Sequence, residues 1–325
     1  MARPTSTHVA FLLVIFALMV AGSADSNAQD STFKSGVEMV PLTVTVTDGA
    51  GNYVSGLSQR DFAVFEDGVL QPLSFFASGS VPVDVAFVID TSSSMSTDLM
   101  LVQRAAKGLV RALREGDRGA VVSVNSVIDM PQRFTTDHAA VAAAIDALRT
   151  SGATALYDGV YIALKEFARE QRDRTSVRRR VLVLLSDGVD NVSHVAADEV
   201  TELAKRVDVS VYVIASKGPT PVPTAASRDP KLQRAAFTMR QLAQDAGGRI
   251  FFPTVADDLP AIYQAIAQEL TSQYDLGYVP AQSTSDGKFR RVSVRVLPPT
   301  SAVARTRSGY YSTRVAGLRP YVRDR

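Results

Sequence analysis

Beyond an apolar leader, the hydrophobic and polar positions of the chain form three successive patterns. The first pattern, within residues 36–80, is typical of β-structure. Residues 42–46 alternate between apolar side chains and threonine, and turn residues such as Asp67 and Gly68 follow a second strand-like run. We therefore expect an N-terminal β segment that ends in the Ser-, Gly- and Pro-containing stretch around residue 80.

The second pattern, residues 81–272, alternates short apolar runs with longer amphipathic runs. Apolar runs without alternation are typical of strands covered on both faces, and alternation with helices favours right-handed βαβ units. We therefore predict an α/β fold: a doubly wound, mainly parallel sheet with helices on both faces. The expected strands are 83–90, 119–127, 181–185 and 209–215, and the expected helices are 99–115, 139–148, 156–171, 196–207, 232–246 and 259–272.

The third pattern, residues 273–313, returns to β-structure, with strand-like runs at 274–279, 289–297 and 305–312. An isolated piece of two or three strands would be marginally stable. We therefore expect the N- and C-terminal β segments to pair into one β-sandwich that carries the α/β domain as an insertion. The remaining residues, 314–325, are predicted to be a loose tail.

The leader, residues 1–24, has the features of a secretory signal. Arg3 supplies a positive charge, residues 9–20 are almost entirely apolar, and small residues at 22–24 offer a cleavage site, with a later one near residue 28. A bilayer crossing needs about 20 apolar residues, so a cleaved signal is favoured over an uncleaved anchor. Because no second run of spanning length follows, we expect an exported chain without a membrane span, in a periplasm or outside the cell.

Composition narrows the classes of function. The chain has 46% hydrophobic and 21% charged residues, as in globular proteins, and 35 Lys and Arg against 33 Asp and Glu give no charge excess that would indicate a nucleic-acid partner. Cys is absent, which excludes disulfides, thiolate metal sites, cysteine nucleophiles and a lipid-anchor cysteine. Outside the leader only His138 and His194 could serve a catalytic triad or a zinc site.

Oxygen-bearing side chains gather where the predicted parallel strands end. Asp90, Ser92 and Ser94 follow the first strand of the α/β region, Asp187 follows the strand at 181–185, and Thr154 precedes a predicted helix. Ligands of open α/β sheets bind outside the carboxyl ends of the strands. Hard oxygen donors suit a small hard cation such as Mg²⁺ and disfavour zinc or copper. Taken singly, each of these residues is also typical of a helix cap or a turn.

Together these residues resemble the metal-ion-dependent adhesion site of the von Willebrand factor A-type (VWA) domain. Its Asp-x-Ser-x-Ser motif matches Asp90, Ser92 and Ser94, its separate threonine matches Thr154, and its late aspartate matches Asp187. The resemblance implies that the three hydroxyls bind Mg²⁺ directly, with Mn²⁺ or Ca²⁺ as the alternatives, while the two aspartates hold coordinated waters. It also implies a non-enzymatic role in adhesion, in which a Glu or Asp carboxylate of a partner protein completes the coordination.

The chain as a whole is similar to a bacterial secreted group in which a VWA domain carries flanking β segments. The residues that carry this likeness are 43–48, 61–68, 246–249 and 274–278. The likeness indicates an architecture more than an activity.

Two other functions remain open from the sequence. The first is a structural envelope or assembly protein in which the metal only stabilises the loops. The second is a metal-assisted hydrolase, for which His194 is the nearest candidate base. Asp158 and Asp190 are interpreted as loop or helix-terminal residues near the site.

Overall fold

The computed structural model describes residues 39–79, 81–172, 178–187, 189–215, 229–281, 286–298 and 301–312. They belong to one compact unit that begins at Glu38. The predicted leader and the predicted tail lie outside the described residues. Within the described ranges, no helix combines the length and the apolar character that a membrane crossing requires.

A six-stranded sheet forms the centre of the α/β domain, in the order β10-β9-β8-β5-β6-β7. All neighbouring pairs are parallel except β6 with β7. Every residue of β5 is buried, as its unbroken apolar sequence predicts for a central strand. The strands are β5 (Val83–Asp90), β6 (Arg118–Val124), β7 (Asp129–Thr135), β8 (Arg179–Ser186), β9 (Ser210–Ala215) and β10 (Arg249–Phe251).

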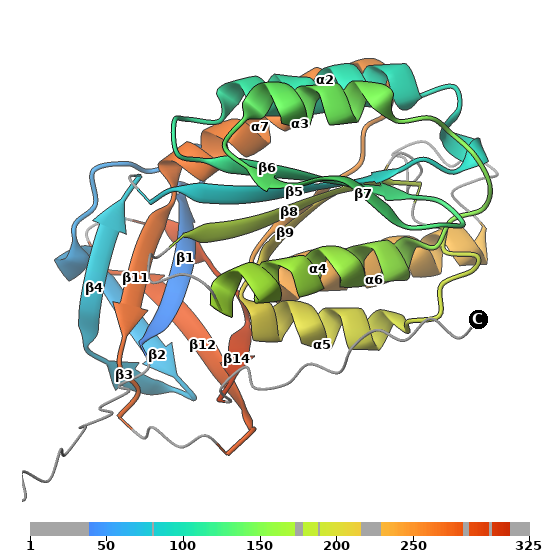
Figure 1. The fold of residues 1–325 in the computed structure, drawn as a ribbon. Helices are drawn as coiled ribbons and strands as arrows, with labels where there is room; N and C mark the ends of the chain where they lie inside the picture. Colours follow the sequence, from blue (N-terminus) through green and yellow to red (C-terminus); the bar gives the residue numbers. More distant parts are fainter. Residues whose placement is uncertain are drawn as a thin grey trace, which may run out of the picture. The chain divides into compact units, whose positions relative to one another are not determined.

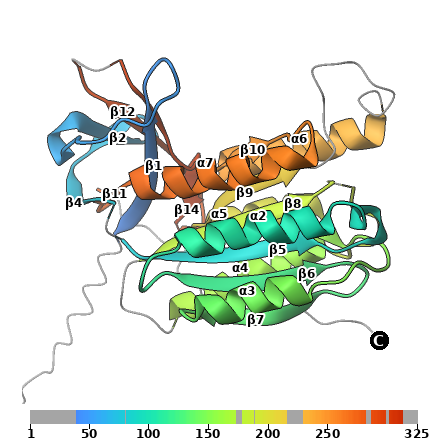
Figure 2. The ribbon, with the colours of Figure 1, turned by 90° about the horizontal axis from the view of Figure 1, so that it is seen from above.

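Helices cover both faces of this sheet, which confirms the predicted fold class (Figure 1). On one face lie α2 (Leu99–Ala112), α3 (His138–Ala147) and α7 (Leu259–Ser272), seen from above in Figure 2. On the other face lie α4 (Leu156–Arg172), α5 (Ala197–Val207) and α6 (Pro230–Asp245). Each face has its own apolar core, built from alternate residues of the same strands.

Strand β7 was not predicted from the sequence. It is an edge strand that is half or fully exposed along its length, and it contains Asp129, Pro131 and Arg133. Charged residues and proline are typical of edges that avoid pairing with another chain, and they hide the strand pattern in the sequence.

The flanking segments form two further four-stranded sheets, β13-β1-β11-β4 and β14-β12-β2-β3. N-terminal strands pair with C-terminal ones, as predicted: β1 pairs with β11 and β2 pairs with β12, both antiparallel. The two sheets share an apolar core that includes Leu42, Val64, Leu276 and Val294. The strands are β1 (Val40–Thr47), β2 (Phe62–Glu66), β3 (Val69–Gln71), β4 (Leu73–Ser78), β11 (Tyr274–Tyr278), β12 (Phe289–Val296), β13 (Val303–Arg305) and β14 (Gly309–Tyr311).

One run predicted as a single strand, 305–312, is two strands in different sheets. β13 pairs with β1, and β14 pairs with β12, so the chain crosses from one sheet to the other between them. The crossing residues pass close to Gly247, where a Cβ atom would lie 2.6 Å from the backbone nitrogen of Arg307. Because Gly247 also has a φ of +76°, no other residue fits this turn without strain.

Candidate metal centre

Asp90 is the last residue of β5 and is fully buried. The Ser92 backbone N–H donates to one of its carboxylate oxygens at 2.9 Å, and the Ser186 hydroxyl donates to the other at 2.7 Å. Burial raises the pKa of Asp90 above its ordinary value, and the nearby charge of Asp187 raises the pKa further, while hydrogen bonds from Ser92 and Ser186 lower it. Hydrogen bonds thus hold Asp90 at both of its carboxylate oxygens.

The two serines of the motif lie beyond Asp90 at a short 3-10 turn, η2 (Ser93–Met95). Met95 is fully buried and anchors this turn in the core. The Ser92 and Ser94 hydroxyl oxygens are 3.0 Å apart. Ser92 is buried, whereas Ser94 is exposed. The pair therefore brings together one buried and one exposed hydroxyl.

Thr154 belongs to a second loop, 151–155, which is fastened to the first one. The Ser151 N–H donates to the Thr91 carbonyl at 2.8 Å, and the Ser93 N–H donates to the Gly152 carbonyl at 3.0 Å. Ser92 therefore lies between Thr91 and Ser93, and both of these are hydrogen-bonded to the loop that bears Thr154. Thr154 itself is buried.

Asp187 begins the third loop, directly after β8. In the parallel register Ile89 lies opposite Leu185, so Asp187 extends one residue further along the sheet edge than Asp90. Asp187 is buried and accepts a hydrogen bond from the Val189 N–H at 3.2 Å. The N–H groups of Asn191 and Val192 both donate to the Thr154 carbonyl, at 2.9 and 3.3 Å. The third loop is therefore bonded to the second.

Asp158 and Asp190 position these loops. Asp190 accepts the Leu156 N–H at 2.8 Å and so caps the start of α4. The buried Asp158 accepts the N–H groups of His194 and Val195, at 3.0 and 2.9 Å, and its other oxygen lies 3.0 Å from His194 Nδ1. The bond to Asp158 holds the His194 ring through Nδ1, with the side chain 79% exposed.

The donor set can be compared with what Mg²⁺ requires. Neighbouring ligands of an octahedral Mg²⁺ ion lie about 2.9 Å apart when each bond is about 2.0–2.1 Å. The Ser92 and Ser94 hydroxyls are hydrogen-bonded to each other at 3.0 Å, so their oxygens are close enough to bind one such ion. The described residues contain no group of three or more His, Asp or Glu that could hold a metal. A cation at this place would therefore depend on hydroxyl groups, and Asp90 and Asp187 would supply the negative charge.

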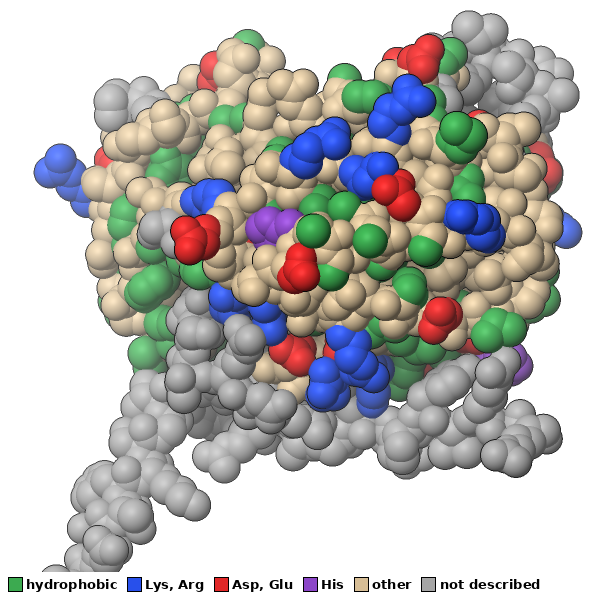
Figure 3. Space-filling view, turned by 45° about the horizontal axis from the view of Figure 1, so that its top comes forward, with side chains coloured by type: hydrophobic (Ala, Val, Ile, Leu, Met, Phe, Trp, Pro, Cys, Tyr) green, Lys and Arg blue, Asp and Glu red, His purple; other side chains and the backbone are tan. Residues whose placement is uncertain are grey.

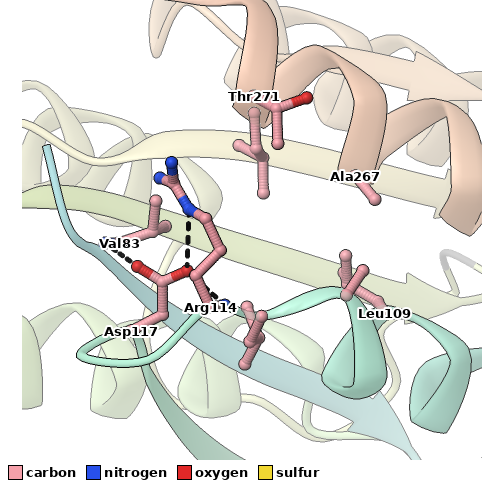
Figure 4. Close-up of a pocket in the computed structure, with 9 residues that line it drawn as sticks. Val83, Leu109, Arg114, Asp117, Ala267 and Thr271 are labelled. Carbon is pink, nitrogen blue, oxygen red and sulfur yellow. Dashed lines mark hydrogen bonds and ion pairs between the residues drawn. The ribbon is translucent and has the colours of Figure 1, made fainter. Parts of the chain in front are cut away.

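A pocket elsewhere in the domain belongs to the opposite end of the sheet. Its lining includes Val83, Leu109, Arg114, Asp117 and Leu270, between α2 and α7 (Figure 4). Val83 is the first residue of β5 and Asp90 is the last, which separates the two places by roughly 23 Å. The pocket is therefore not part of the candidate metal site.

Some residues that hold the loops of the candidate site in place could not be identified from the sequence. Ser186 supports Asp90 from a different strand, and Asn125 and Thr91 link the loop after β6 to the loop after β5 at 3.3 Å. The only available signal was that Ser186 directly precedes Asp187 at a predicted strand end. Its contact with Asp90 depends on the register between β5 and β8.

Comparison with known proteins agrees with this architecture. The family model for the von Willebrand factor type A domain matches residues 84–265 of this chain. This match covers more than half of the chain, and the chain therefore belongs to the VWA family.

Individual proteins resemble this chain only at low sequence identity or over part of its length. An uncharacterized protein of Synechocystis is 33% identical over 111 residues, which is 33% of this chain and 26% of that protein. A UPF0353 protein of Nocardia farcinica is 26% identical over 209 residues, covering 57% of this chain and 62% of that protein. The chain thus spans less than two thirds of either relative. A solved von Willebrand factor type A structure from Catenulispora acidiphila has 15% identity and a TM-score of 0.49, with 75% of this chain and 71% of that chain covered.

Proposed function

We propose that this protein is exported and binds a protein ligand through a divalent cation at Asp90, Ser92, Ser94, Thr154 and Asp187. One observation carries the proposal: the three loops that bear these residues are hydrogen-bonded to one another at the carboxyl edge of a parallel sheet. Sequence positions as distant as 90 and 187 are thereby brought to one place. Membership of the VWA family supports the same interpretation.

The hydroxyls of Ser92, Ser94 and Thr154 would hold Mg²⁺ directly, and Asp90 and Asp187 would bind its coordinated waters. When bound, the cation supplies a Lewis-acidic position that an external carboxylate can occupy. Neutral hydroxyls leave most of the positive charge uncompensated, so a Glu or Asp of a partner is attracted strongly. Asp90 is held rigidly from both of its oxygens, which keeps the loop ready for the ion.

Calorimetric titration of the mature protein with Mg²⁺ and with Mn²⁺ tests the site. We expect saturable binding by the wild type and its loss in the Ser92→Ala/Ser94→Ala double variant. Ser96→Ala is the matched control, because Ser96 is exposed in the same loop and is not one of the proposed ligands. Binding should also raise the melting temperature, since a ligand at 100 times its Kd stabilises the folded state by about 2.7 kcal/mol.

Two results would contradict the proposal. One is a wild-type protein that shows no saturable binding of either ion. The other is a double variant that binds as tightly as the Ser96→Ala control, which would place the ion elsewhere.

A further inference from the structure

One face of the sheet β14-β12-β2-β3 is turned to solvent along β12, β2 and β3. Val64 and Val294 are buried in the sandwich core, and successive side chains of a strand point to opposite sides, so their neighbours along each strand point outward. The strand register places Phe65 opposite Ser293 on one side and opposite Leu70 on the other. We refer to the six outward residues as the outer face: Ala63, Phe65, Leu70, Arg291, Ser293 and Arg295.

Aliphatic side chains are exposed on the outer face and at its edges. Leu70 and Val69, both in the edge strand β3, are each 62% exposed. Leu297 is 41% exposed and follows Arg295 by two residues, and its N–H donates to the carbonyl of Asp61, directly before β2. Large apolar side chains that are exposed in one place are typical of a surface that contacts another molecule or a membrane.

The charged residues of the outer face are both arginines. Arg291 and Arg295 are exposed, and the Arg295 guanidinium lies over the ring of Phe65, 4.8 Å from its centroid. A guanidinium that is stacked on an aromatic ring still offers the N–H groups at the edge of its plane to a phosphate oxygen. Among the described residues, no carboxylate forms an ion pair with either arginine.

Carboxylates lie around the outer face and not on it. Glu66 of β2 is buried and accepts hydrogen bonds from two tyrosines of the sandwich. Asp61 and Asp67 lie at the two ends of β2, and each accepts a hydrogen bond from a backbone N–H group. Asp286 precedes β12 and Glu202 belongs to α5, and each forms an ion pair with a basic neighbour. Basic side chains stand at the same margins, namely Arg60, Lys205, Arg206, Lys288 and Arg290. The carboxylates of the margins are thus matched, and the two arginines give the outer face itself a positive charge.

The helical surface of the α/β domain differs from the outer face. Lys and Arg side chains are interspersed with Asp and Glu on the face of the molecule shown in Figure 3. Lys107 of α2 and Asp146 of α3, for example, form an ion pair at 2.5 Å. The six residues of the outer face have no such mixture of charges.

We propose that the outer face binds the surface of a lipid bilayer that carries anionic headgroups. Arg291 and Arg295 contact the phosphates, while Leu70 and Leu297 enter the boundary between the headgroups and the acyl chains. The basic and the aliphatic side chains select this ligand together, because a soluble polyanion would leave the aliphatic side chains in water. Addition of a strand from a partner protein is disfavoured, since the edge strand β3 has three residues and is followed by Pro72.

This inference does not depend on the proposed metal site. β5 begins at Val83, soon after the sandwich strand β4 ends at Ser78, and runs to Asp90, so its carboxyl end points away from the sandwich (Figure 1). A bilayer that contacts the outer face therefore leaves the candidate metal site open to solvent. Binding to the bilayer should be the same in Mg²⁺ and in chelator.

Cosedimentation of the mature protein with lipid vesicles tests the proposal. We expect binding to vesicles of phosphatidylglycerol and phosphatidylcholine, little binding to phosphatidylcholine alone, and weaker binding when the salt is raised from about 50 to about 500 mM. Arg291→Gln/Arg295→Gln should weaken the binding by about thirtyfold. Arg104→Gln/Arg111→Gln is the matched control, because both arginines are exposed on α2 and the change in net charge is the same.

The aliphatic contact has its own test. Leu70→Trp introduces a tryptophan into a chain that has none. Its fluorescence should shift to shorter wavelength when anionic vesicles are added, because the indole leaves water. Val255→Trp is the control: Val255 is 58% exposed in the α/β domain, and its fluorescence should not shift. Because every substituted side chain is exposed, the melting temperatures of the variants should stay close to that of the wild type.

Four results would overturn the inference. They are the absence of binding to anionic vesicles, equal binding to phosphatidylcholine alone, an Arg291→Gln/Arg295→Gln protein that binds as tightly as the α2 control, and an unshifted Leu70→Trp spectrum. Binding of soluble polyglutamate without binding of vesicles would also overturn it, and would assign the two arginines to a soluble polyanion. Loss of vesicle binding in the outer-face variant alone, together with the Leu70→Trp shift, would support it.

Discussion

At the scale of single residues, the candidate site depends on a carboxylate that is buried but well supplied with hydrogen bonds. Asp90 accepts one from Ser92 and one from Ser186, while the charge of Asp187 opposes its ionisation. A cation placed beside the two aspartates would relieve this repulsion. Removal of the cation should therefore destabilise the loops mainly through the repulsion between Asp90 and Asp187.

Asp90→Asn should separate the charge of this residue from its structural role. The amide keeps an oxygen for the Ser92 N–H, and the Ser186 hydroxyl can rotate to accept from the amide nitrogen. We expect the free energy of unfolding without metal to change by less than about 1 kcal/mol, and the rise in melting temperature caused by Mg²⁺ to disappear. Thermal unfolding with Mg²⁺ and with chelator measures both.

Asp98→Asn is the control for this variant, because Asp98 lies at the end of the same loop and is half-exposed. It should keep the full response to Mg²⁺. An Asp90→Asn protein with the same response as this control would show that the buried carboxylate is not needed for the ion.

The sequence indicated which of the candidate residues lie close together better than it indicated the residues that support them. Asp90, Ser92 and Ser94 fall within five positions, so their proximity follows from the chain itself. Ser186 reaches Asp90 only because two strands pair in one register, and neither residue type nor spacing indicates this pairing.

At the scale of elements, α4 connects the packing of the sheet to the site. Gly159 in its first turns lies against β6, and a Cβ at this position would be 2.3 Å from a methyl carbon of Val124. The helix can approach the sheet this closely only without a side chain at this position. Thr154 precedes the helix by two residues, so the position of α4 sets that of Thr154.

Gly159→Ala should therefore act on stability and on metal binding together. We expect a loss of about 1–3 kcal/mol in the free energy of unfolding because α4 must move away from β6, and weaker Mg²⁺ binding because Thr154 moves with it. Gly108→Ala in α2 is the control: its Cβ would meet only the end of the Arg111 side chain at 4.0 Å, and a gain of about 0.5–1 kcal/mol is expected. Urea unfolding compares the two, and equal stabilities would contradict the packing argument.

Helices and strands could be predicted where a buried face imposes a regular pattern of apolar positions on the sequence. Helix 259–272 was predicted with the bounds that the structure shows, because its apolar positions face one core. Strand β7 and the division of 305–312 into two strands were not, since an edge strand buries little and a crossing between sheets leaves no periodic pattern.

At the scale of the whole molecule, a buried polar network joins the sandwich to the α/β domain. Arg179 of β8 forms a bidentate pair with Asp275 of β11 and also donates to the carbonyls of Leu270 and Gln273. Beside it, the fully buried Glu269 of α7 accepts from Thr45, Tyr53, Tyr212 and Arg305. The pairing of the flanking segments was predictable from the marginal stability of each alone. This network was not predictable, because it joins residues from six elements, namely β1, β8, β9, β11, β13 and α7.

Arg179→Met should destabilise the protein by about 3–5 kcal/mol, since it leaves Asp275 buried without its partner. Adding Asp275→Asn should restore part of this loss, because the remaining buried group is then neutral. Denaturant unfolding followed by two spectroscopic probes measures these values. Lys107→Met, which removes the half-exposed pair with Asp146, should change stability little; a similar loss in both single variants would argue against a special role for the buried pair.

The register between β4 and β11 has a mechanical consequence. Ser78, where the chain leaves the sandwich, lies opposite Tyr274, where it returns. The α/β domain lies between these positions in the sequence, so the pairing of β4 with β11 holds the two ends of the domain together. Tension applied to the ends of the chain would be carried by the sandwich first and would reach the metal-site loops only after β4 and β11 had separated. The loops of the candidate site can therefore stay folded while the chain that carries them is under load.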